Sequence, residues 1–472
     1  MRKTYRVIAA LITVLCAFGC SAMAATYYLD SSVATSGNGQ SWSTAWKNFS
    51  NISGLVAGDT VYISGGSTSQ TYTLDSWMPS SGTSGRPITY QVGQDAGHNG
   101  TVIFTGGTHW IGNGNTATLQ YITINGLGSD GTNRMAVQGY SDYPIYCESG
   151  TNCVHISFLH INFTETAGFR FSNSAAIELG YNSIIKSYWG SDGTHDDVIW
   201  ACQESSSGAY DCLIHDNYIS YPVYSGNSAL GDDCIKWGQG MQVYNNHFHA
   251  NLTTYSSNQG TAQHSDGFQV NVSHYKVYNN LFEDIGESFF YHDDFDTPRS
   301  IEGIYIYNNL FVQSHAAGTN VARAIDILPE SNGIGTSFTD VVVANNDFVD
   351  MNGFSYIIRV ASITSCTNCH WQNNIDYNNI GNYQMSGLVT QSNNSTGASF
   401  VSHTQYAVST NNLHLASNDT ANIGQGTNLS TYFTTDKDGV SRPQSSAWDI
   451  GAYEFVSTTA LSPPTNLTAT VQ

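Results

Sequence analysis

The chain has 472 residues and a formal net charge of −21 at pH 7, with 36 Asp plus Glu against 15 Lys plus Arg. This acidic balance argues against binding to nucleic acid and against anionic membrane surfaces, because both attract basic proteins. It does not exclude an acidic glycan, since a bound divalent cation such as Ca²⁺ reverses the local charge.

Residues 1–24 are predicted to be a secretory signal peptide. Three basic residues (Arg2, Lys3 and Arg6) precede an apolar run over 7–18, and the small residues at 22–24 form a cleavage site. No later stretch is apolar for long enough to insert into a membrane. We therefore expect a secreted protein, in the periplasm or outside the cell.

Residues 25–455 are predicted to form one domain, which opens with an N-terminal cap. Its main feature is a repeated phrase: Tyr-Asn-Asn at 244–246, 278–280 and 307–309, and Asn pairs at 345–346 and 373–374. The second Asn recurs after 34, 29, 37 and 28 residues, which is typical of a solenoid. Weaker copies extend the pattern upstream, and Asn411-Asn412 is expected to continue it downstream.

The residues around the phrase indicate which solenoid this is. Alternating runs such as Ile304-Tyr305-Ile306-Tyr307 precede each Asn pair and predict short strands with one buried face. Asn tolerates the left-handed conformation, so an Asn pair suits a tight corner whose side chains stack from coil to coil. We therefore predict an all-β fold, a right-handed parallel β-helix of about ten coils.

Seven cysteines remain outside the signal peptide, and six of them are close together in pairs. We expect the disulfides Cys147–Cys153, Cys202–Cys212 and Cys366–Cys369, as in proteins from oxidising compartments. Cys234 is left over, and no His motif beside it suggests a nucleophile. We expect it to be a small buried residue.

A second strand in each coil predicts a polar column. If Ile177, Ile235, Phe268, Ile325 and Ile358 point inward, alternation sends the next residue of each strand outward. The predicted column contains Glu178, Lys236, Gln269, Asp326 and Arg359, with Tyr291 or His292 in the intervening coil and Trp237 beside it. Polar and aromatic side chains on one face predict a groove that binds sugar rings.

Carboxylates gather where these strands begin. Asp232, Asp233, Asp266 and Asp294 fall on three successive coils, and neighbouring strands lie about 4.8 Å apart. Adjacent like charges destabilise a fold unless something binds them, so a metal site or a catalytic pair is expected. Alternatively, these are turn-forming Asp residues in a solvated loop.

The positions of the few basic residues suggest a base and holders of a substrate carboxylate. Lys236, Arg323 and Arg359 all fall on or beside the column. Lys236 could act as a base if cationic or metal neighbours lower its pKa, and Arg323 or Arg359 could hold a substrate carboxylate. In the alternative reading, Lys236 is a structural partner of Asp233 or Glu178.

Residues 456–472 are predicted to be a linker and the start of another module. The segment 463–471 resembles the first strand of a fibronectin type III module, and one strand cannot form that sandwich.

Two phrases carry a resemblance at the level of fold. Residues 26–66 and the phrase Trp448-Asp449-Ile450-Gly451-Ala452-Tyr453-Glu454-Phe455 resemble the beginning and end of secreted bacterial β-helix proteins of the pectate-lyase-like superfamily. Asp232-Asp233-Cys234-Ile235 resembles a stretch of polygalacturonases, but the Gly-His-Gly and Arg-Ile-Lys phrases of that family are missing. An Asp cluster with a Lys base resembles the logic of β-helix pectate lyases.

Three hypotheses follow. The first is a lyase of an acidic polysaccharide, with Ca²⁺ as cofactor, Asp232, Asp233, Asp266 and Asp294 as ligands, and Lys236, Asp233, Asp266 and Arg323 in catalysis. The second is an inverting glycoside hydrolase in which Asp233 and Asp266 share the acid and base roles. The third is a non-catalytic adhesin that binds structural calcium. A monomer is expected in each case.

Overall fold

The computed structural model describes residues 23–457 except 113, 115, 187–196, 201, 223–232, 252–265, 293–298, 316–322, 329–335, 353–355 and 380–381. The predicted signal peptide, apart from its last two residues, lies outside this part of the chain, as do the segment predicted to resemble a fibronectin module, Asp232 and Asp294. No helix within the described part has the length and apolarity needed to cross a bilayer.

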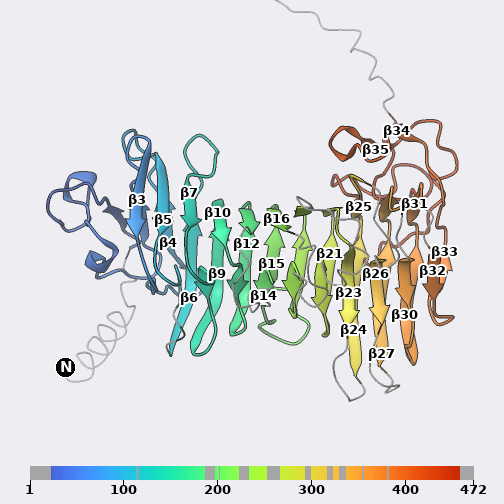
Figure 1. Ribbon diagram of the computed structural model, residues 1–472, viewed down its shortest axis with the longest axis horizontal. Helices are drawn as coiled ribbons and strands as arrows, with labels where there is room; N and C mark the ends of the chain where they lie inside the picture. The colour runs from blue at the N-terminus through green and yellow to red at the C-terminus, as the bar shows by residue number, and fades with distance from the viewer. Residues whose placement is uncertain are drawn as a thin grey trace, which may run out of the picture.

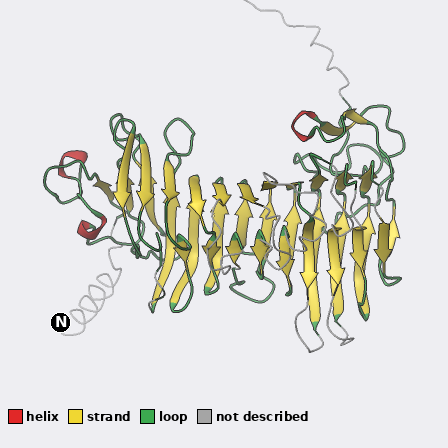
Figure 2. Cartoon of the chain, in the orientation of Figure 1, coloured by secondary structure: helices red, strands yellow, loops and turns green. Residues whose placement is uncertain are grey.

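The molecule is an elongated cylinder of strands, as Figures 1 and 2 show. The helical elements in the described part of the chain are three short 3₁₀ helices, η1 (Trp42–Thr44), η2 (Phe49–Asn51) and η4 (Val408–Thr410). Almost all strands belong to three parallel sheets, which we name A, B and C and which form the three faces of the cylinder.

Sheet A has thirteen strands: β1 (Thr26–Leu29), β2 (Thr60–Ile63), β4 (Ile88–Val92), β6 (Ala117–Asn125), β9 (Thr151–Leu159), β12 (Ser174–Gly180), β15 (Cys212–His215), β18 (Met241–Tyr244), β21 (Tyr275–Tyr278), β24 (Ser300–Tyr307), β27 (Ser337–Ala344), β30 (Ser365–Gln372) and β33 (Thr390–Ser392). Sheet B has eleven: β3 (Ser69–Thr73), β5 (Thr101–Thr105), β7 (Met135–Gln138), β10 (Ile161–Thr166), β13 (Ser183–Lys186), β16 (Tyr218–Pro222), β19 (His247–Asn251), β22 (Leu281–Glu283), β25 (Leu310–Val312), β28 (Asp347–Val349) and β31 (Ile375–Tyr377).

Sheet C has nine: β8 (Ile145–Tyr146), β11 (Phe169–Arg170), β14 (Ile199–Trp200), β17 (Ile235–Lys236), β20 (Phe268–Val270), β23 (Glu287–His292), β26 (Arg323–Leu328), β29 (Tyr356–Val360) and β32 (Asn382–Met385). Each turn of the chain runs from A to B to C and back to A. The predicted parallel β-helix is confirmed. Nine described turns have a strand in all three sheets, against about ten expected.

The corner between sheets A and B carries the predicted stack of asparagines. The second Asn of each pair accepts a hydrogen bond from its counterpart one turn earlier, as in Asn246 N to Asn280 Oδ1 at 3.0 Å and Asn280 N to Asn309 Oδ1 at 2.9 Å. The first Asn has a positive φ, 57° at Asn279 and 54° at Asn308. The first position takes the left-handed turn, which Asn favours although Tyr181 and Asp216 also adopt it, and the second position supplies the ladder.

One downstream prediction is wrong. Asn412 does not continue the ladder, because it begins β35 (Asn412–Leu415), which pairs antiparallel with β34 (Phe400–Ser402) outside the three sheets. The ladder continues instead through Asn394, whose Oδ1 accepts from Asn374 N at 3.0 Å.

The core is a continuous apolar stack inside the cylinder. Phe248, Phe282, Phe311 and Phe348 follow successive Asn corners, and their ring centroids lie 5.0, 4.8 and 4.7 Å apart. All four are buried, as the sequence predicts. The three predicted disulfides are also confirmed, and Cys234 is buried outside them.

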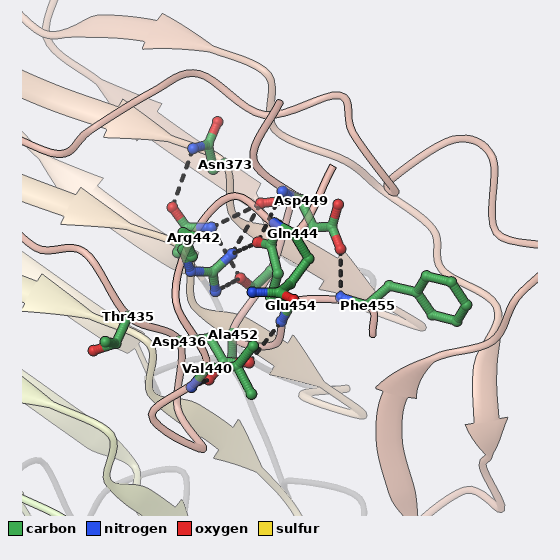
Figure 3. A network of polar contacts seen from close by, with 12 residues as sticks. Asn373, Thr435, Asp436, Val440, Arg442, Gln444, Asp449, Ala452, Glu454 and Phe455 are labelled. Atoms are coloured by element: carbon green, nitrogen blue, oxygen red, sulfur yellow. Dashed lines mark hydrogen bonds and ion pairs between the residues drawn. The ribbon is translucent and has the colours of Figure 1, made fainter. Parts of the chain in front are cut away.

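The segment 425–455 lies across several turns at the A–B corner, where it closes this end of the molecule. Arg442 is fully buried and pairs with Glu454 at 2.9 Å, and its guanidinium also donates to the carbonyl of Gly451 at 2.9 Å (Figure 3). Asn345 Nδ2 donates to the carbonyls of Asp449 and Gly451, both at 2.9 Å. The outer Asn of the corner therefore anchors the C-terminal segment that the sequence places at the end of the domain.

Candidate active site

The outer face of sheet C carries the polar column. The strand register aligns Trp200, Lys236 and Gln269 on β14, β17 and β20, and it continues through Phe290 to Asp326 and Arg359 on β26 and β29. The structure thus brings four of the five predicted column residues together, namely Lys236, Gln269, Asp326 and Arg359. Their inward neighbours Ile235, Phe268, Ile325 and Ile358 are buried, as expected.

Glu178 is the exception, and its predicted place in the column is wrong. It lies on β12 in sheet A, where it aligns with Ser157 and Leu213 and contacts His215 at 3.1 Å. The physical reason is its distance from the corner: Glu178 comes four residues before Asn182, which accepts a ladder hydrogen bond from Ile161 N. A strand that leads directly into the Asn corner belongs to sheet A.

Of the two residues predicted for the intervening coil, Tyr291 is wrong. Tyr291 aligns with the inward residues Val270 and Ile327 and is completely buried, so it cannot meet a substrate. In the strand register, the backbone position that aligns with Gln269 is Phe290, one residue earlier. The side chain of His292 lies outside the described atoms, as do Asp232 and Asp294.

A second row of residues lies where the chain enters sheet C. We name Asp197, Asp233, Asp266 and Glu287 the acidic row. The amide after each acid donates to the carbonyl of the next acid along the row: Val198 N to Asp233 O at 2.9 Å, Cys234 N to Asp266 O at 2.8 Å and Gly267 N to Glu287 O at 2.8 Å. All four acids are at least 95% buried. Four acidic side chains therefore stand side by side on consecutive turns.

Asp197 and Glu287 were not among the predicted site residues. A signal for Asp197 exists in the sequence, because Asp197-Val198-Ile199-Trp200 has the same pattern as Asp233-Cys234-Ile235-Lys236 and Asp266-Gly267-Phe268-Gln269. Each repeat places an acid three residues before a column residue.

Lys236 lies at the centre of this arrangement. Its Nζ atom is 3.1 Å from Asp233 Oδ2 and 3.5 Å from Asp197 Oδ1. Residues three apart on a straight strand face opposite sides, so this contact shows that the chain bends between Asp233 and Lys236. The bend brings the acidic row and the column to one site.

Arg323 and Arg359 form ion pairs with acids on turns of the β-helix that follow the turn of Lys236. Arg323 contacts Glu287 at 2.8 Å and Asp326 at 3.1 Å, and the guanidinium of Arg359 grips both oxygens of Asp326. Their contacts orient Glu287 within the row and Asp326 beside it. Their predicted role as holders of a substrate carboxylate stays a prediction.

Burial and mutual repulsion raise the pKa values of three acids of the row, Asp197, Asp266 and Glu287. Burial, and next the charge of Asp233, raises the pKa of Asp197 to about 7. The same two causes raise the pKa of Asp266 well above its usual value, and burial followed by the charge of Asp266 does so for Glu287. The row therefore holds protons, or would bind a cation, near neutral pH.

The pKa of Lys236 is raised, whereas the role of a base requires a lowered pKa. Burial lowers it, but the charges of Asp233 and Asp197 outweigh burial, and the pKa is raised above the usual value for Lys. In this state Lys236 is a protonated partner of two carboxylates. It becomes a base only if those charges are neutralised.

The acidic row is a candidate calcium site, although no three of its described side chains place ligand atoms within 4.8 Å of one another. Calcium prefers carboxylate oxygens, and the row offers them from successive turns. The Oδ1 atom of Asp197 is buried, and its ion pair with Lys236 Nζ, at 3.5 Å, is longer than a normal hydrogen bond. Asp197, Asp233 and Asp266 are the described residues that could hold the ion.

Aromatic side chains flank the site on one side. Trp200 and Trp237 lie 4.7 Å apart at 74°, and Lys236 Nζ lies 5.7 and 5.4 Å from their ring centroids. Arg170 stacks on Trp200 at 3.9 Å. Trp237 is 39% exposed, so it offers an open face to a sugar ring.

Trp237 also lines a pocket of about 400 Å³. The other lining residues are mainly polar and include Gln203, Glu204, Gln239 and Asn271. Gln239 donates to Glu204 at 2.7 Å, which fixes both side chains at the wall. An aromatic face beside amides and a carboxylate is suited to sugar hydroxyls.

Comparison with known proteins yields structural similarity only. No protein-family model matches the sequence, and no curated protein does. The solved structure of pectate lyase Pel9A is similar at 15% identity and a TM-score of 0.49, over 91% of this chain and 96% of that one. The PL6 family alginate lyase AlyGC gives 12% and 0.37, over 84% and 55% of the two chains.

A rhamnogalacturonan lyase gives 14% identity and a TM-score of 0.35, over 80% of this chain and 91% of that one. Because these identities are 15% or lower and the TM-scores are below 0.5, no functional conclusion follows from the similarities.

Proposed function

We propose that the protein is a secreted polysaccharide lyase that cleaves an acidic, uronate-containing glycan by β-elimination and depends on Ca²⁺. The observation that carries the proposal is the contact of Lys236 with Asp233 and Asp197, within a row of buried carboxylates beside the exposed Trp237. Buried like charges destabilise a fold unless a bound cation compensates them. Buried carboxylates with raised pKa values are also typical of catalytic sites.

The reaction removes the C5 proton of a uronate and expels the oxygen at C4. The electrons of the C5–H bond form the C4–C5 double bond, the C4–O bond breaks, and the leaving oxygen takes up a proton. Ca²⁺, when bound, would neutralise the uronate carboxylate and thereby make the C5 proton more acidic. Asp197, Asp233 and Asp266 would hold it.

Lys236 is the proposed base. In the structure its pKa is raised by Asp233 and Asp197. Once the charge of those carboxylates is neutralised, burial is the remaining effect, and burial lowers the pKa of a lysine. The neutral amine then accepts the C5 proton. Trp237 and Gln269 would position the sugar rings on either side of it.

Secretion and domain organisation belong to the same proposal. Three disulfides are typical of an oxidising compartment, which supports export after removal of residues 1–24. We propose that 25–455 is the catalytic β-helix and that 456–472 comprises a linker and a segment similar to the start of a fibronectin type III module.

The alternative of an inverting hydrolase is less well supported. Its two carboxyl groups would need to stand about 6.5 to 9.5 Å apart to admit a water. Asp233 and Asp266, the predicted pair, are instead the acids of two adjacent turns, whose strands lie only about 4.8 Å apart.

The test is an assay of the purified mature protein on pectate, alginate and neutral glycans, in Ca²⁺ and in EDTA. Ultraviolet absorbance of the unsaturated product and reducing ends are followed together. Lys236→Met should abolish both, and Lys276→Ala on sheet A is the matched control. Reducing ends without the chromophore would support hydrolysis, and binding without any product would support an adhesin.

A further inference from the structure

A second cluster of metal-binding side chains lies on sheet B. His249 on β19 and Glu283 on β22 are direct neighbours in the strand register. Phe248 and Phe282 beside them are buried in the core, so His249 and Glu283 point outward. Asp284 follows Glu283 at the turn, with a φ of 63°. One potential ligand atom from each of the three residues lies within 4.8 Å of the others.

Each of the three side chains is held in place by a different outer neighbour. The Nδ1 atom of His249 lies 3.1 Å from the Tyr218 hydroxyl, and Glu283 Oε2 lies 2.7 Å from His247 Nε2. Metal ligands in proteins are oriented by such outer contacts, which fix the imidazole tautomer and the carboxylate direction.

Asp284 is held most firmly. Its Oδ1 accepts from Ser314 N at 2.7 Å and its Oδ2 from Ser314 Oγ at 2.6 Å. Asp284 is also 94% buried, while His249 and Glu283 are partly exposed. The cluster therefore combines a fixed inner carboxylate with two ligands that an ion can reach from solvent.

We propose that His249, Glu283 and Asp284 form a binding site for a divalent transition metal of the Zn²⁺ class. An imidazole with two carboxylates is a donor set that Zn²⁺, Co²⁺ and Ni²⁺ accept, whereas Ca²⁺ prefers oxygen ligands alone. Binding through Nε2 of His249 leaves Nδ1–H to donate to Tyr218. The site is separate from the acidic row and does not depend on the proposed reaction.

The ion would connect two successive turns of the β-helix. It joins β19 to β22 and to the turn after β22, and Asp284 comes only three residues before Glu287 of the acidic row. An ion that binds the folded chain stabilises it in proportion to its concentration over its dissociation constant. We therefore expect Zn²⁺ to stabilise the part of the cylinder that carries the acidic row.

The experiment uses the mature protein without a polyhistidine tag, after removal of metals. Zn²⁺ binding is measured by calorimetry and thermal shift, and Co²⁺ binding by its visible spectrum. One ion per chain should bind, with Ca²⁺ unable to displace it. His249→Ala and Glu283→Gln should weaken Zn²⁺ by more than about 100-fold, and Tyr218→Phe by about 10-fold.

His414→Ala is the control, since His414 is an exposed histidine paired with Asp438 at 2.7 Å elsewhere on the surface. Asp233→Asn is a second control, because it alters the acidic row alone. Both should bind Zn²⁺ as the wild type does. Unchanged binding in folded His249→Ala and Glu283→Gln, or loss of binding in Asp233→Asn, would overturn the proposal, whatever the lyase assay shows.

Discussion

Replacing Asp197 by Asn is expected to stabilise the protein while it removes activity. Burial and Asp233 raise the pKa of Asp197 from the usual 3.8 to about 7. Between these two pH values the unfolded chain has already lost the proton that the folded chain still holds, so folding stability falls as pH rises. The fall is complete above the folded pKa.

The magnitude follows from that difference. At about 1.4 kcal/mol per pKa unit, the raised pKa corresponds to roughly 4 kcal/mol of lost stability above neutral pH. Asn does not ionise and avoids this loss, although it gives up the contact with Lys236. The free energy of unfolding of the variant should exceed that of the wild type by an amount that grows from about 1 kcal/mol near pH 4 to about 4 kcal/mol near pH 8.

The assay is denaturant unfolding of both proteins in EDTA across this pH range, repeated with Ca²⁺. In Ca²⁺ the order should reverse, because only the wild type keeps all the proposed ligands. Asp340→Asn on sheet A, at a partly exposed position, should change stability by less than about 0.5 kcal/mol at every pH. A stability difference between Asp197→Asn and wild type that does not depend on pH would refute the reasoning.

Three further changes test other parts of the account. Lys236→Met should lower kcat by about 10²- to 10⁴-fold with unchanged thermal stability in Ca²⁺, whereas Lys276→Ala should retain activity; equal losses in both would contradict the assignment. Trp237→Ala should raise KM by about 2- to 10-fold with little change in kcat, because stacking contributes about 0.5 to 1.5 kcal/mol; a fall in kcat alone would place Trp237 in the chemistry instead. Asn309→Ala should lower the free energy of unfolding by about 1 to 3 kcal/mol, because it leaves buried groups of the ladder without hydrogen-bond partners. A chevron or melting curve identical to that of the wild type would contradict the role of the ladder.

The fold could be predicted because its signal is local and repeated. An Asn corner, an alternating strand before it and an inward Phe after it recur in each coil, so Asn246, Asn280 and Asn309 fix the stacking of the turns. The disulfides could be predicted for the same reason, since each closes a short loop.

The site was predicted less completely, because it depends on register and on bends. Glu178 was assigned to the wrong sheet since its strand alternates like those of sheet C, and only its distance from Asn182 distinguishes the two. Tyr291 was one residue out of register, which reverses the side it faces. The contact between Lys236 and Asp233 needs a bend that alternation does not reveal. Asp197 left a signal in its repeated pattern, but its pKa arises from burial beside Asp233, which no pattern contains.

The most direct measurement is the structure of the product released from a polyuronate by the purified protein. Mass spectrometry with ultraviolet detection should find a sugar with a C4–C5 double bond, formed with Ca²⁺, lost in EDTA and restored when Ca²⁺ is returned. Saturated products that carry oxygen from water, formed equally in EDTA, would contradict elimination at Lys236 and the role of the acidic row.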